Sequence, residues 1–160
     1  MKKSFAVFAC LAALAIFLTV QSAAAQGKLE GAWKATEITY TGPNAHTNTN
    51  PSPSVVIFTK EYYSLMVDSI DKPRPELSQN PTAEEIRTAF ALFWANAGTY
   101  EVKGTVLTLH PLLAKRPGTP PDAFFTMEFN IQGNILILVD KGSYLGPAVN
   151  PFTLKLTRLE

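Results

Sequence analysis

Apolar and polar residues alternate in short runs that cover most of the chain, and Gly, Pro and Asn separate the runs. A period of two is typical of strands that bury one face, and the separating residues are typical of turns. The pattern predicts eight strands. They span residues 33–40, 55–59, 62–68, 99–102, 105–113, 123–131, 135–139 and 152–159.

Most of the predicted connections are short enough to be hairpins, so the expected sheet is antiparallel. Eight antiparallel strands can close into an up-and-down barrel whose interior holds side chains or one small ligand. Closure also removes the exposed strand edges that invite aggregation. We therefore expect an all-β fold, an eight-stranded antiparallel up-and-down barrel.

One short α-helix is predicted between the third and fourth strands. Thr82 is a suitable N-cap, and Glu85 three residues later completes a capping box. Gly98 favours a helix end between residues 94 and 97. The apolar stripe at helical spacing consists of Ile86, Ala89, Phe90 and Phe93. We expect this stripe to pack against the barrel, and over an open end the helix would act as a lid.

The first 25 residues have the pattern of a removable export signal. Lys2 and Lys3 precede an apolar run over residues 5–20, and Ala23 and Ala25 form an A-x-A cleavage site. Cleavage there leaves one domain, residues 26–160, in the periplasm or outside the cell. The apolar run is short for a membrane span, so we expect no integral membrane insertion after signal removal.

Composition excludes several kinds of chemistry from the mature chain. The single cysteine, Cys10, lies in the signal, which leaves neither a disulfide nor a catalytic thiol. Without Lys2 and Lys3, 12 of the 14 basic side chains remain against 13 acidic ones, a formal charge of −1. We expect no nucleic-acid partner, because no basic patch stands out. The two isolated histidines predict no metal site, and no phosphate-binding or nucleotide motif indicates a cofactor.

Several short motifs in a fixed order resemble those of lipocalins, and more closely those of bacterial lipocalin-like domain proteins. Gly31-Ala32-Trp33 opens the first strand, and Arg158 lies on the last. Between them come an Ala-x-x-Gly-x-Tyr-x-Val segment at residues 95–102, a Val-x-x-x-His stretch at 106–110, and a hairpin centred on Gly133. The resemblance implies a calycin-type β-barrel that binds a small hydrophobic molecule.

In such a barrel the first and last strands are neighbours, so Trp33 and Arg158 are predicted to meet. The guanidinium over the indole face would form a cation–π contact of roughly 0.5–2 kcal/mol. We assign this pair a structural role in barrel closure.

Alternation also predicts which side chains face the barrel interior. The inward set is Trp33, Ala35 and Glu37; Tyr63, Leu65 and Val67; Tyr100 and Val102; Val106, Thr108, His110 and Leu112; Phe125, Met127, Phe129 and Ile131; and Phe152, Leu154 and Leu156. Two interpretations stay open: an aromatic-lined ligand cup or a core filled with side chains. The ligand-binding candidates are Tyr63, Leu65, Tyr100, Thr108, His110, Phe125, Met127 and Phe129.

His110 is the sharpest candidate for chemistry, because a buried imidazole near Glu37 or Tyr100 could act in acid–base catalysis. The competing interpretation is a core histidine with a hydrogen-bond partner, and His46 is expected to be solvated. Three functions follow. The leading hypothesis is binding of a small hydrophobic ligand, the second a cofactor-free isomerase or cyclase, and the third an interaction or inhibitor module acting through loops 41–54 or 141–151.

Overall fold

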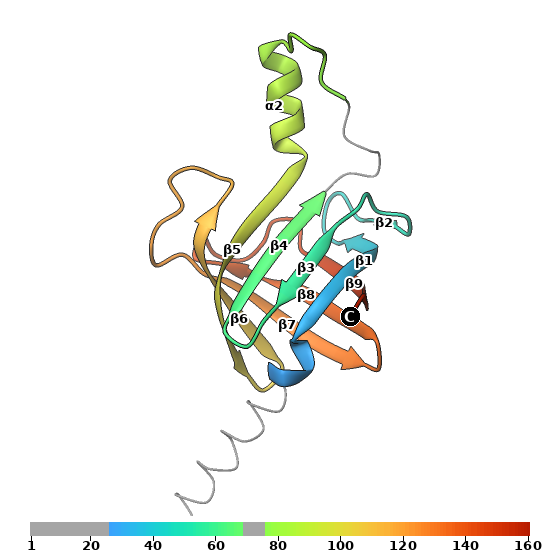
Figure 1. Ribbon diagram of the computed structural model, residues 1–160, viewed down its shortest axis with the longest axis vertical. Helices are drawn as coiled ribbons and strands as arrows, with labels where there is room; N and C mark the ends of the chain where they lie inside the picture. The colour runs from blue at the N-terminus through green and yellow to red at the C-terminus, as the bar shows by residue number, and fades with distance from the viewer. Residues whose placement is uncertain (1–25, 69–75) are drawn as a thin grey trace, which may run out of the picture.

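The computed structural model describes residues 26–68 and 76–160, so the predicted signal at 1–25 and residues 69–75 of a predicted loop lie outside it. Eight strands form a closed antiparallel barrel with up-and-down topology, as predicted (Figure 1). Pairing of the first strand with the last closes it. The barrel strands are β1 (Gly31–Tyr40), β3 (Val55–Phe58), β4 (Tyr62–Asp68), β5 (Phe93–Lys103), β6 (Val106–Ala114), β7 (Phe125–Gln132), β8 (Ile135–Ser143) and β9 (Phe152–Arg158).

A further short strand, β2 (His46–Asn48), lies where the sequence predicted only loop. β2 pairs with the second half of β1, and β3 pairs with the first half. The His46 ring stacks on Tyr40, with 4.8 Å between ring centroids. His46 is exposed to solvent, as expected, and this stacking is an addition to that expectation.

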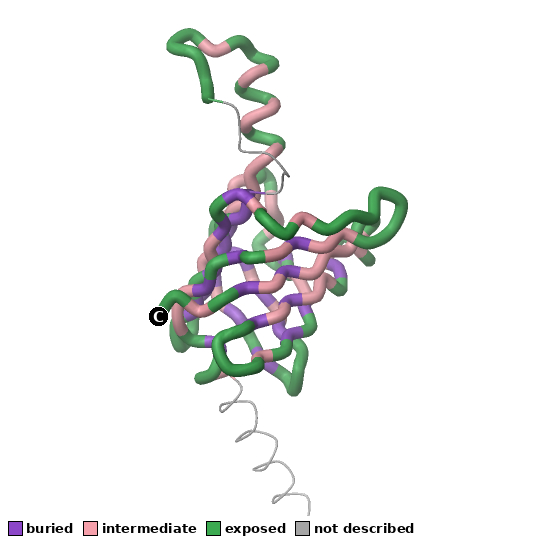
Figure 2. The backbone as a smooth tube through the Cα atoms, turned by 90° about the vertical axis from the view of Figure 1, so that its right-hand side faces the viewer, coloured by how far each residue is buried: buried purple, intermediate pink, exposed green. Residues whose placement is uncertain are grey.

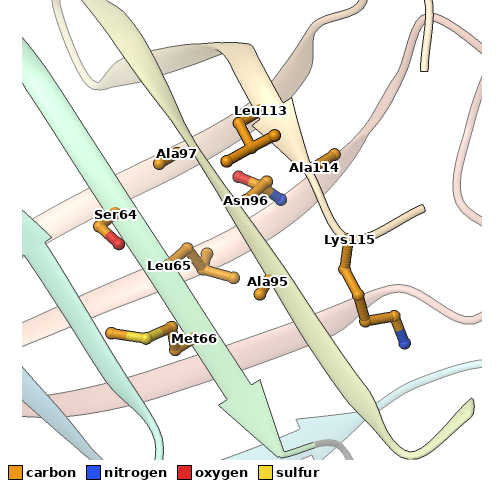
Figure 3. Close-up of a pocket in the computed structure, with 9 residues that line it drawn as sticks. All are labelled: Ser64, Leu65, Met66, Ala95, Asn96, Ala97, Leu113, Ala114 and Lys115. Carbon is orange, nitrogen blue, oxygen red and sulfur yellow. The ribbon is translucent and has the colours of Figure 1, made fainter. Parts of the chain in front are cut away.

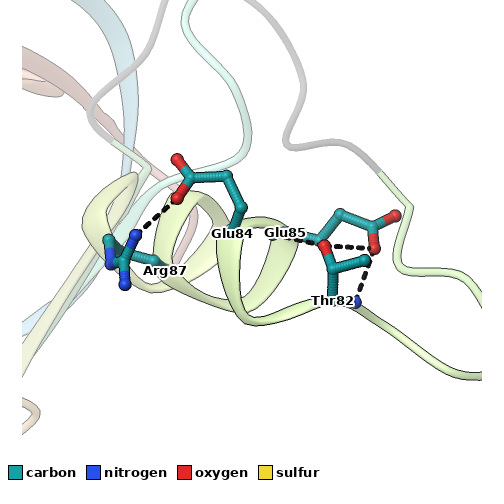
Figure 4. Close-up of polar contacts among 4 residues, drawn as sticks. All are labelled: Thr82, Glu84, Glu85 and Arg87. Carbon is teal, nitrogen blue, oxygen red and sulfur yellow. Dashed lines mark hydrogen bonds and ion pairs between the residues drawn. The ribbon is translucent and has the colours of Figure 1, made fainter.

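The helix α2 (Ala83–Ala91) begins as predicted and ends earlier. Thr82 Oγ1 accepts a hydrogen bond from the backbone N–H of Glu85, and the Thr82 N–H donates to Glu85 Oε2, at 3.2 and 2.7 Å (Figure 4). Glu84 and Arg87 form an exposed ion pair on the same helix, and such pairs contribute little. The capping box is confirmed.

Strand β5 begins at Phe93, so the predicted helix end between residues 94 and 97 is wrong. Residues 93–99 form a ladder with β4, in which Trp94 faces Val67 and Gly98 faces Tyr63. The hydrogen bonds of this ladder take the place of the helical hydrogen bonds that the prediction required. Along this part of β5, the small residues Ala95 and Ala97 alternate with Trp94 and Asn96. Gly98 is needed inside the strand, because a Cβ there would lie 2.0 Å from the carbonyl oxygen of His110.

The predicted packing of the helix stripe on the barrel is also wrong. Helix α2 rises from the barrel at the start of β5, and none of its residues is buried (Figures 1 and 2). Ile86 and Phe90 are 51% and 49% exposed. The Phe90 ring instead lies beneath the ammonium of Lys115, 3.8 Å from its centroid.

Side chains from all eight barrel strands fill the interior as one cluster. Buried and exposed residues alternate along the strands in Figure 2. The most completely buried large residues include Trp33, Leu65, Leu107, Leu109, Met127, Leu136, Leu138, Leu154 and Leu156. The core is therefore packed by apolar side chains along most of the barrel axis.

Candidate functional site

One end of the barrel, which we call the Trp33 end, is closed by Trp33 and Arg158. Trp33 is 0% exposed, and its indole N–H donates to the Leu29 carbonyl at 2.8 Å. The Arg158 guanidinium lies 4.0 Å from the ring centroid and donates to the carbonyls of Glu30 and Lys28, at 2.5 and 2.6 Å. The predicted contact is present, and the strong donors at this end have partners.

Tyr100, a predicted ligand residue, belongs to the Trp33 end as well. Its hydroxyl donates to the carbonyl of Thr59 at 2.7 Å, and its ring meets Phe58 edge to face at 5.2 Å. Burial raises the pKa of the Tyr100 hydroxyl. This tyrosine helps to hold β5 against the β3–β4 hairpin.

The sequence predicted that Glu37 faces the barrel interior. In the structure it does not. The register between β1 and β9 shifts after Ala35, so that Glu37 pairs with Lys155 and Ile38 pairs with the buried Leu154. This β-bulge adds one residue to β1 and reverses the face of every later side chain. Ile38, 2% exposed, takes the inward position.

The predicted face of β6 is also inverted. Leu107 and Leu109 are 0% and 2% exposed and face the core, so Thr108 and His110 face outward. Burying two leucines removes more apolar surface from water than burying a threonine and a histidine. The other two residues predicted to face inward on this strand, Val106 and Leu112, are 40% and 74% exposed.

The proposed acid–base set is therefore not assembled. His110 and Glu37 lie on the outer face of the barrel, whereas Tyr100 points inward at the Trp33 end. In the described part of the chain, no group of three or more His, Cys, Asp or Glu side chains could hold a metal ion.

Five of the predicted ligand residues belong to the packed core: Tyr63, Leu65, Tyr100, Met127 and Phe129. The Tyr63 hydroxyl and the side-chain oxygen of Asn96 are buried without a hydrogen-bond partner. Burial raises the pKa of Tyr63 well above its usual range. Buried polar groups of this kind usually bind an internal water or a ligand atom.

The opposite end of the barrel, the Trp94 end, carries a half-buried aromatic cluster. Trp94 meets Phe125 and Phe152 edge to face, with centroids 5.7 and 5.8 Å apart. Tyr144 lies 6.3 Å from Phe125, and Tyr40 lies 6.5 Å from Phe152. These five rings are only partly covered, unlike Trp33. They form an apolar surface that remains accessible at one end of a packed barrel.

An acidic side chain, Asp140, shares the inner face with this cluster. It pairs with Met127 across β7 and β8, and directly paired residues point to the same side of a sheet. Met127 is buried, so Asp140 points inward, half-buried. Burial raises the pKa of the Asp140 carboxyl, and the hydrogen bond from Gly142 N–H, 2.9 Å long, opposes that shift.

The sequence prediction missed both Trp94 and Asp140. Trp94 was assigned to the end of the helix, and Asp140 lay just beyond a strand predicted to stop at residue 139. The alternation of Trp94, Asn96 and Gly98 with two alanines is a period-two signal that would have placed Trp94 on a strand. Asp140 continues the alternation of the buried Leu136 and Leu138, so a strand predicted to extend one residue further would have placed it on the inner face.

A separate groove of about 340 Å³ runs across the outer face of β4, β5 and β6 (Figure 3). Ala95 and Ala97 leave room between Met66 of β4 and Leu113 of β6. Ser64 and Lys115 add the polar groups, so the groove is mainly apolar. It lies near the base of α2, because Lys115 also contacts Phe90 of that helix.

No protein-family model matches the chain, and neither a curated protein nor a solved structure matches it significantly. The described residues include no helix that is long and apolar enough to cross a membrane. The architecture is consistent with a calycin-like barrel.

Proposed function

We propose that this is an exported lipocalin-like protein that binds a small hydrophobic molecule at the Trp94 end of its barrel. The observation that carries this proposal is the half-buried aromatic cluster of Trp94, Phe125, Phe152, Tyr40 and Tyr144. Aromatic walls are common in small-molecule sites, and partly exposed rings have apolar surface left to bury.

The packed core directs the ligand to this end rather than to the middle of the barrel. Leu65, Met127 and Phe129 already bury their side chains against one another. Of the ligand residues predicted from sequence, Phe125 alone belongs to the aromatic cluster. Burying apolar ligand surface against these rings would contribute roughly 25 cal/mol per Å².

The family and the cellular location are parts of the same proposal. Gly31-Ala32-Trp33 on the first strand, Arg158 on the last and a closed eight-stranded barrel are what a lipocalin-like protein would have. The pattern at residues 1–25 supports export to the periplasm or beyond.

The proposal is tested with a neutral hydrophobic dye, N-phenyl-1-naphthylamine, whose fluorescence rises in apolar surroundings. We expect saturable binding to the mature chain. A Phe125→Ala/Phe152→Ala variant should weaken binding about tenfold, because two of the rings in contact with Trp94 are removed.

The matched control is Ile57→Ala, which removes an apolar side chain that is 37% exposed on the outer face of β3. It should leave the dye affinity unchanged. Absence of saturable binding, or equal losses in the control and the double variant, would refute the proposed site.

A second candidate function is an interaction module that pairs two copies of the chain. The apolar side of α2, with Ile86 and Phe90 half-exposed, is convex, and the groove near its base is concave and apolar. The acidic first turn of α2 would approach Lys115 at the groove of the second copy. The enzyme hypothesis has no comparable support, because its acid–base residues lie apart.

Light scattering across a concentration series separates these candidates. Self-association that disappears in a Phe90→Ser/Leu113→Ser variant, while Tyr62→Ser has no effect, would favour the interaction module. A monomer at every concentration would exclude pairing of two copies.

A further inference from the structure

Asp140 is the charged residue that the barrel directs toward the aromatic cluster. Leu138 and Leu154 form an inward pair between β8 and β9, so the next inward positions toward the Trp94 end are Asp140 and Phe152. On the other side, Asp140 faces Met127, two residues from Phe125. The inward position of Asp140 is thus flanked by the strands that carry Phe125 and Phe152, whose rings both contact Trp94.

No lysine or arginine in the described part of the chain pairs with Asp140. The neighbouring cation, Lys141, points outward and binds Glu128 at 2.8 Å. Arg158, the inward-facing arginine, lies at the Trp33 end and contacts Trp33 and two backbone carbonyls. Asp140 accepts a hydrogen bond from the backbone N–H of Gly142, and an asparagine oxygen could accept the same bond.

A half-buried carboxylate without a neighbouring cation destabilises the folded state, because burial disfavours its charged form. The raised pKa of Asp140 is a sign of that cost. Aromatic rings near a carboxylate form a combination that can recognise ammonium groups, since ring faces and a carboxylate both attract positive charge. An anionic head group would instead meet repulsion there.

We infer that the ligand of the Trp94 end is a cationic amphiphile, an ammonium group on an apolar tail, with the ammonium held between Asp140 and the rings of Trp94, Phe125 and Phe152. This inference rests on the proposed ligand-binding function and specifies its chemistry. The tail extends over the remaining aromatic surface of Tyr40 and Tyr144.

The test compares three probes with the same ten-carbon tail by calorimetry on the mature chain at about pH 8, where the carboxyl groups are ionised. They are decyltrimethylammonium, 1-decanol and decanoate. We expect the cation to bind about tenfold more tightly than the alcohol, and decanoate to bind most weakly. Asp140→Asn should lower the cation affinity about tenfold and change the alcohol affinity less than about twofold.

Glu128→Gln is the matched control, because it removes a carboxylate from the outer face of the neighbouring strand. It should alter none of the three affinities. If the alcohol and decanoate bind and the cation is not preferred, or if Asp140→Asn weakens all probes equally, the inference fails and the proposed function stands. If none of the three binds and the dye does not bind either, both fail.

Discussion

The two ends of this barrel each carry a tryptophan on an inner face, and they use it differently. Trp33 is fully buried, its N–H has a carbonyl partner, and a guanidinium covers its ring. Trp94 is half-buried, and its neighbours are two phenylalanine rings rather than a cation. At one end, a tryptophan whose N–H and ring face both have partners closes the barrel. At the other end, apolar ring surface and the Asp140 carboxyl group remain free to contact a ligand.

Replacing each tryptophan in turn should reveal the largest difference in stability between the two ends. Trp33→Ala should lower the free energy of unfolding by about 3–5 kcal/mol, the usual range for deleting a buried tryptophan. Trp94→Ala should cost about 1–2 kcal/mol, because part of its side chain is already in water. Urea unfolding followed by circular dichroism measures both. Equal losses would contradict the difference between the ends.

Gly31→Ala should be the next largest effect, and it concerns the Trp33 end alone. Gly31 has φ of 127°, and a Cβ there would lie 2.5 Å from the Glu160 carbonyl oxygen and 2.7 Å from Arg158 Nη1. We expect a loss of about 2 kcal/mol in the same measurement, from backbone strain and displacement of the guanidinium.

Gly27→Ala is the control for that substitution, because no atom lies within 4 Å of a Cβ at that position. It should change stability by less than about 0.5 kcal/mol. A Gly31→Ala protein as stable as this control would show that the Arg158 position does not constrain the first strand.

Asp140→Asn should have a smaller effect of opposite sign. The pKa of Asp140 is raised in the folded state, so the folded chain binds its proton more tightly than the unfolded chain does. The stability from this group is therefore complete at acid pH and is lost as pH rises through the raised pKa. The variant should melt at a higher temperature at neutral pH, and the difference should vanish on acidification.

The smallest effect on the barrel is expected from Thr82→Ala at the helix cap. Loss of the cap costs a helix about 1 kcal/mol, and a nine-residue helix with no buried residue has little to offset it. We expect a loss of helical circular dichroism and an unchanged barrel melting temperature. A coupled fall in both would show that α2 is packed on the barrel after all. Thr82→Ser, which keeps the cap, should behave like the parent.

Local patterns predicted the parts of the molecule in which neighbours along the chain decide the outcome. The bounds of β4 and the pair Thr82 and Glu85 follow from alternation and from a capping box. Trp33 and Arg158 could be paired because a closed barrel brings its first and last strands together. The site was less predictable. Of its residues, Phe125 was named as a ligand contact, whereas Trp94 and Asp140 were assigned to a helix and to a loop.

By itself, the sequence determined the number and direction of the barrel strands, the start of the helix and the closure at the Trp33 end. The tertiary structure decided which face of β6 is buried, where β1 and β8 gain an extra residue, and that α2 stands away from the barrel. The physical reason is that alternation fixes a period and not a phase. A single bulge reverses every later side chain, and bulges are set by the partner strand. Glu37 turned outward for this reason, whereas Asp140 keeps the inward phase of Leu136 and Leu138. The candidate chemistry therefore moved to the Trp94 end.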